Sequence, residues 1–99
     1  MAPVDERAQG ETFVLERGKG IEFTTVLLGF ASSALIHMGV QPHPESGSLT
    51  RDAALAREVL DLLALLREKT RGNLTPEEER FFDSLLTDLR LKFVEAFPR

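Results

Sequence analysis

The sequence predicts an all-α fold: a three-helix domain in which an αα-hairpin packs on a strongly apolar first helix, after a flexible N-terminal tail. Apolar residues recur at steps of three and four along most of the chain after residue 20, as they do on one face of a helix. Glycine- and proline-rich segments divide these stretches into three. Ninety-nine residues suffice for one core and not for two, so residues 21–97 are expected to form a single helical domain.

The first twenty residues are expected to form the flexible tail. They carry scattered charges and three glycines, with one apolar island at Thr12–Leu15. The island could form a short strand or dock on a partner, but four residues without a recognisable partner strand are weak evidence for a strand. The start of the chain has no apolar run of the kind found in secretory signals, and the chain has no cysteine, so a cytoplasmic location is expected.

The first helix is predicted from about Ile21 to Met38, and Gly39 is a natural stop. Residues on one stripe follow helical spacing: Phe23, Leu27, Phe30, Ala34 and Met38. Other apolar residues fall off that stripe, so the helix is apolar around most of its circumference and would leave apolar surface bare on a lone three-helix domain. Its polar residues argue against a membrane span.

Small residues at every fourth position of this helix form a narrow strip that another helix could approach closely. Together with the apolar residues off the main stripe, they give the predicted surface for self-association. Its members are Thr25, Leu28, Gly29, Ser33, Leu35 and Ile36.

The second helix is expected to follow a loop at Gln41–Ser48, with Thr50 as its N-cap, and to run to about Arg71. Its predicted inward stripe consists of Leu55, Val59, Leu62, Leu63 and Leu66. Gly72 suits the left-handed residue that follows a helix end, and the nearby basic residues suit the negative end of the helix dipole.

The third helix has the clearest start in the sequence. Thr75 is a natural N-cap, Pro76 suits the first helical position, and Glu78 completes a capping box. Pro98 ends the helix, and a short turn makes it an antiparallel neighbour of the second. The predicted inward residues are Phe82, Leu85, Leu86, Leu89, Phe93 and Ala96.

The sequence offers no pattern of an enzyme, a cofactor site or a metal site. His37 and His43 are six residues apart and have no further ligand beside them. The acidic run Glu77–Glu79 suits a helix N-terminus, and Lys69 follows a helix rather than the glycine-rich turn of a phosphate-binding loop. A net charge of -4 disfavours nucleic acid as a partner.

A basic cluster near the end of the second helix has two readings. Arg67, Lys69 and Arg71, with Asn73 beside them, could contact an acidic partner, or the three charges could simply suit a helix C-terminus.

The run Glu68–Glu78, with Lys-Thr-Arg-Gly-Asn-Leu at its centre, and the later Leu89-Arg90 pair closely resemble small bacterial proteins of the domain of unknown function 1844 family. The first helix adds Phe23-Thr24-Thr25, Ala31 to Leu35 and His37-Met38-Gly39 to this resemblance, which spans about residues 21 to 95. It implies a short helical domain without established catalytic residues. Relatives in gliding bacteria are associated with polarity complexes around a small Ras-like GTPase, so the resemblance also implies GTPase regulation as an alternative function.

The leading hypothesis is therefore a non-enzymatic interaction or adaptor module that self-associates through its first helix or buries that helix against a partner protein. The alternative is a regulator of a small Ras-like GTPase. Its expected contact residues are Arg67, Lys69, Arg71 and Asn73.

Overall fold

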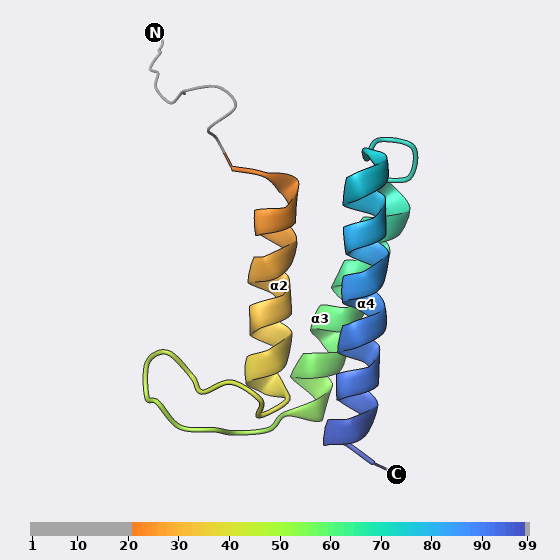
Figure 1. Ribbon diagram of the computed structural model, residues 1–99. Helices are drawn as coiled ribbons and strands as arrows, with labels where there is room; N and C mark the ends of the chain where they lie inside the picture. Colours follow the sequence, from red (N-terminus) through yellow and green to blue (C-terminus); the bar gives the residue numbers. More distant parts are fainter. Residues whose placement is uncertain (1–20, 99) are drawn as a thin grey trace, which may run out of the picture.

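Three helices account for most of the part of the chain that the structure describes, residues 21–98 of a computed structural model. They are α2 (Phe23–His37), α3 (Ala53–Lys69) and α4 (Pro76–Ala96). The chain runs along α2, back along α3 and forward again along α4, so that α2 and α4 point the same way (Figure 1). Each helix contacts the other two. The predicted all-α three-helix fold is confirmed, whereas the tail predicted at residues 1–20 lies outside the described residues.

The boundary between α3 and α4 follows the sequence prediction. The Thr75 hydroxyl accepts a hydrogen bond from the Glu78 N–H at 3.1 Å, and the Glu78 carboxylate accepts one from the Thr75 N–H at 2.9 Å. Pro76 takes the first helical position, where a missing N–H costs nothing. Gly72 has a φ of 83°, the left-handed conformation expected of it. These caps fix the short turn that sets α4 antiparallel to α3.

The start of α3 differs from the prediction. Asp52, not Thr50, is the N-cap, and its carboxylate accepts a hydrogen bond from the Leu55 N–H at 3.0 Å. The Thr50 hydroxyl is instead 2.8 Å from the His43 Nε2 atom. Threonine and aspartate both cap helices well, so the sequence alone could not decide between Thr50 and Asp52 as the N-cap.

The connection between α2 and α3, residues 38–52, is held at both ends. Gly39 follows α2 with a φ of 80°, and the Asp52 N–H donates to the His37 carbonyl at 2.7 Å. A Cβ atom at Gly39 would lie 2.5 Å from the Arg51 Cγ atom. The end of α2 and the start of α3 are therefore tied together although a wide loop separates them in sequence (Figure 1).

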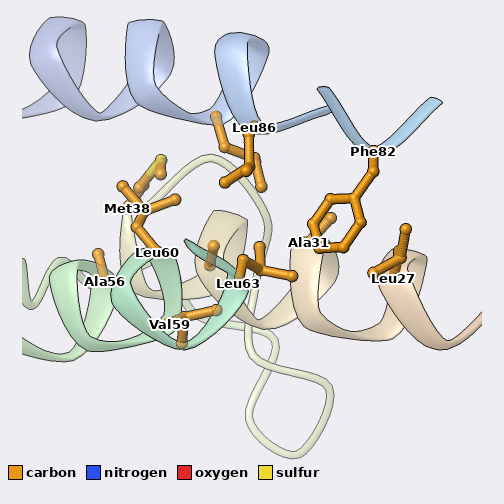
Figure 2. Packing of buried hydrophobic residues seen from close by; sticks show 11 residues of the cluster. Leu27, Ala31, Met38, Ala56, Val59, Leu60, Leu63, Phe82 and Leu86 are labelled. Carbon is orange, nitrogen blue, oxygen red and sulfur yellow. The ribbon is translucent and has the colours of Figure 1, made fainter. Parts of the chain in front are cut away.

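The core lies between all three helices. Figure 2 shows Phe82 of α4 directed toward Leu27 and Ala31 of α2, with Leu63 of α3 nearby. The Phe82 ring also packs against the Phe23 ring at a centroid distance of 5.9 Å. The buried apolar residues are Leu27, Ala31, Ala34, Met38, Ala56, Val59, Leu60, Leu63, Phe82, Leu86 and Leu89.

The inward face of α3 is rotated from the predicted one. Leu55 and Leu62, both expected to face the core, are 42% and 45% exposed. Val59 and Leu63 are buried as predicted, and Ala56 and Leu60 complete the core side of α3 in place of Leu55 and Leu62. Because α3 carries leucines over much more than one stripe, two neighbouring helices cannot cover all of them, and the surplus lies on the flank beside α2.

Candidate functional site

A mainly apolar depression on the described surface lies where α2 meets α3. It is lined by Phe23, Val26 and Phe30 of α2 and by Leu62, Leu65, Leu66 and Lys69 of α3. We call this the α2–α3 groove. Val26, Leu62 and Leu65 are 40%, 45% and 54% exposed, so its walls are open to solvent.

Helical spacing explains how the groove forms. Positions 23, 26 and 30 follow steps of three and four and share one side of α2, while positions 62, 65, 66 and 69 do the same on α3. Since the two helices are antiparallel, the first half of α2 lies beside the last half of α3. From Phe23 to Phe30 the helix rises by about 10 Å, which is roughly the length of the groove.

The chemistry of the groove suits binding and not catalysis. Among residues 21–98, Lys69 is the one charged residue that lines it, and the other lining residues are aliphatic or aromatic. General acid-base or nucleophilic catalysis needs polar side chains that converge on a reacting atom, and these walls offer only the Lys69 amine at one end. An apolar surface with one cationic end can bind a complementary apolar surface that carries an acidic residue.

A second depression, between α3 and α4, has a mixed lining. Leu60, Ala64, Phe93 and Val94 contribute its apolar part, and Arg57, Asp61 and Arg90 contribute charges of both signs. Water and the neighbouring charges can satisfy these polar groups without a partner, so exposure is less costly here than in the α2–α3 groove. The groove is therefore the better candidate.

None of the predicted self-association residues of α2 lines the groove. Thr25 and Gly29 are exposed, and a Cβ atom built at Gly29 would meet nothing within 4 Å. Leu28 is 52% exposed, while Ser33, Leu35 and Ile36 are half-buried. Thus Leu28 is the main exposed apolar side chain of this set, and the larger exposed apolar area is in the groove.

The predicted basic cluster is divided by the fold. Arg67 faces α4, where its Nε donates to Asp83 at 2.9 Å, and its guanidinium lies 3.9 Å from the Glu79 carboxylate and over the Phe82 ring. The hydrogen bond from Arg67 is the main reason that the pKa of Asp83 is lowered, and the same bond raises the pKa of Arg67.

The other three expected contact residues have different surroundings. Arg71 pairs with Glu68, and this hydrogen bond lowers the pKa of the Glu68 carboxyl. Asn73 is exposed in the turn, where its N–H donates to the Thr70 carbonyl. Lys69 lines the α2–α3 groove. Of the four residues, Lys69 alone joins the groove.

Sequence reasoning did not single out the groove residues Val26, Leu62 and Leu65 as a surface. The signal was present in the two adjacent leucine pairs at 62–63 and 65–66. A helix with two neighbours has one broad buried face, and successive residues are separated by about 100° around the axis. At least one leucine of each pair therefore has to lie near the edge of that face or outside it.

One recognised sequence family covers the groove and all of the three helices except Ala96, the last residue of α4. The family described as "Domain of unknown function (DUF1844)" matches residues 20–95. The chain belongs to this family. No curated protein and no solved structure matches the chain.

Membership of the domain of unknown function 1844 family confirms the resemblance carried by the Glu68–Glu78 run. No helix within residues 21–98 is long and apolar enough to cross a membrane. The same residues contain no group of three or more His, Asp or Glu side chains placed to hold a metal ion.

Proposed function

We propose that this member of the domain of unknown function 1844 family is a protein-interaction module that self-associates through the α2–α3 groove. The observation that carries the proposal is the exposure of Val26, Leu62 and Leu65 on a surface that is apolar apart from Lys69. Two copies present the same surface, and identical patches pair naturally about a two-fold axis.

The expected strength of self-association follows from the exposed area. Full burial of an aliphatic side chain contributes about 1.5–3 kcal/mol, and these three side chains are each about half exposed. Two grooves that cover each other therefore gain on the order of 4–8 kcal/mol. Lost translational and rotational freedom costs about 4–15 kcal/mol, so association through this surface should be weak and should depend on concentration.

Sedimentation velocity over a wide concentration range tests this proposal. The average mass of the full chain should rise with concentration, and Leu65→Glu should abolish the rise because a carboxylate in the interface would have to lose its water. Leu91→Glu is the matched control, since Leu91 is an exposed leucine of α4 outside the groove. Leu28→Glu tests the surface first predicted on α2. A mass that stays monomeric throughout, or an equal effect of Leu91→Glu and Leu65→Glu, would contradict self-association through the groove.

Regulation of a small Ras-like GTPase stays a prediction of the family resemblance. Two of its four expected contact residues, Arg67 and Arg71, already pair with carboxylates of the same chain. A GTPase would have to compete with those pairs or use Lys69 and Asn73. Fluorescent-nucleotide release from candidate GTPases, with and without the chain, tests this alternative.

A further inference from the structure

We propose that Phe13-Val14-Leu15 of the N-terminal segment occupies the α2–α3 groove of the same chain whenever no other protein fills it. This inference rests on the proposed function in one respect: both use the same groove. Here the N-terminal residues would control access to that groove. The island would act as a built-in competitor that a partner or a second copy must displace.

Connectivity places this segment at the correct end of the molecule. The described chain begins at Ile21, and Phe23, the first residue of α2, already lines the groove. Residues 16–22 connect the island to that point, and seven extended residues span up to about 25 Å. The groove is roughly 10 Å long, so the connection can reverse direction and still reach its far end. Gly18 and Gly20 lie within this connection and favour a tight reversal.

The composition of the segment matches the groove. Phe13, Val14 and Leu15 form the apolar run of residues 1–20 that lies closer to α2 in sequence, and acidic residues lie on both sides of it at Glu11 and Glu16. Lys69 lies at the end of the groove where α2 begins and α3 ends. Because the connection enters at that same end, Glu16 is placed to approach the Lys69 amine while the three apolar side chains enter the groove.

Covalent attachment makes weak docking sufficient. A short flexible linker gives an effective concentration on the order of millimolar, so an island that binds the groove with a millimolar dissociation constant would already fill about half of the grooves. A second copy at micromolar concentration has no such advantage. Docking of the island would therefore suppress self-association without abolishing it.

Tryptophan fluorescence of the full chain tests the proposal, because the natural sequence contains neither tryptophan nor tyrosine. Phe13→Trp introduces a single reporter at the island, and Val4→Trp introduces a matched reporter elsewhere in the N-terminal segment. We expect the Phe13→Trp emission to lie at shorter wavelength than that of Val4→Trp and to be less accessible to a soluble quencher. Adding Leu65→Glu to Phe13→Trp should remove both differences. Circular dichroism checks that the helices are retained in every variant.

Two results would overturn the proposal. One is equal emission and quenching for the two reporters; the other is a Phe13→Trp shift that grows with protein concentration, because the island would then dock on a second copy. A charge exchange adds a stricter requirement. Lys69→Glu should weaken the shift, and Lys69→Glu with Glu16→Lys should restore it; a failed restoration would remove Glu16 from the docking mode.

The same variants separate this inference from the proposed function. Phe13→Ser with Leu15→Ser should increase self-association in sedimentation experiments by freeing the groove. If the fluorescence shift is present but no variant self-associates, the island docks and the self-association proposal fails. If self-association is present but the fluorescence shift is absent, the self-association proposal stands and the docking proposal fails.

Discussion

Arg67 on α3 and Asp83 on α4 are joined by a hydrogen bond of 2.9 Å between Nε and Oδ1, and the Arg67 guanidinium also lies over the Phe82 ring at 5.9 Å from its centroid. This pair links the two helices of the hairpin beside the core. Arg67 therefore stabilises the α3–α4 contact, whereas the sequence alone allowed it to be read as a contact for another protein.

We expect the Asp83 carboxyl to titrate below its usual range, because its charged form accepts the Arg67 hydrogen bond. A carboxyl whose pKa is lowered by folding stabilises the folded state above its unfolded-state pKa, and this stabilisation is lost as the pH falls through the lowered value. A carboxyl-carbon NMR titration should show the pKa of Asp83 rising in Arg67→Gln. Arg57→Gln should leave it unchanged, and an equal pKa in wild type and Arg67→Gln would contradict the assignment.

The rotated face of α3 predicts unequal losses of stability when two adjacent leucines are replaced by alanine. Leu63 is fully buried, so Leu63→Ala should lower the free energy of unfolding by about 2–5 kcal/mol. Leu62 is 45% exposed, and Leu62→Ala should cost much less. Urea unfolding followed by circular dichroism compares the two variants. Similar losses for the two variants would contradict the rotated face, because the sequence predicts that both leucines face the core.

The capping box should make Thr75 more sensitive to substitution than Thr87. Thr75→Ala removes the acceptor of the Glu78 N–H and should destabilise the chain by about 1 kcal/mol. Thr87 is exposed in the middle of α4, and Thr87→Ala should be neutral or slightly stabilising, since alanine has the higher helix propensity. Thermal unfolding with both variants checks this difference. It would be refuted if Thr75→Ala unfolded at the wild-type temperature.

Three glycines should respond differently to alanine. Gly29→Ala should stabilise α2 by up to about 1 kcal/mol, because the position is helical and has free space. Gly72→Ala should cost about 1–2 kcal/mol for its left-handed backbone alone. Gly39→Ala should cost more than Gly72→Ala, because its Cβ also meets Arg51, whose guanidinium lies over Phe97. Denaturant unfolding of the three variants gives the order of their free energies of unfolding.

Gly29→Ala also tests the strip of small residues on α2. A helix of a second copy packed closely on Thr25, Gly29 and Ser33 would be pushed away by a methyl group. Sedimentation of Gly29→Ala should be unchanged if the α2–α3 groove is the contact surface. Weaker association in a variant with higher stability would instead favour the small-residue strip.

The sequence was sufficient to predict features that depend on residues close to one another along the chain. The capping box at Thr75 and the left-handed Gly72 follow from local hydrogen bonding and backbone sterics, and both are confirmed. The number and order of the helices follow from apolar periodicity in the same way.

Features that depend on how helices rotate against one another could not be read from the sequence. Leu62 and Leu63 have the same side chain, and the way α3 packs against α2 and α4 decides which of them is buried. The α2–α3 groove cannot be predicted from the sequence for this reason, although the sequence does predict an excess of apolar surface. The sequence places that excess on the first helix, and the structure divides it between α2 and α3.

The groove has one wall on each of two helices that are separated in sequence by the connection 38–52. It therefore exists only while α2 is docked against α3. Any molecule that fills it binds the folded chain and not the unfolded one, and such a ligand raises the melting temperature by an amount that grows with its concentration relative to its dissociation constant. The protein can thus serve as its own sensor: a shift in its thermal unfolding curve would reveal a natural partner before the chemistry of that partner is known.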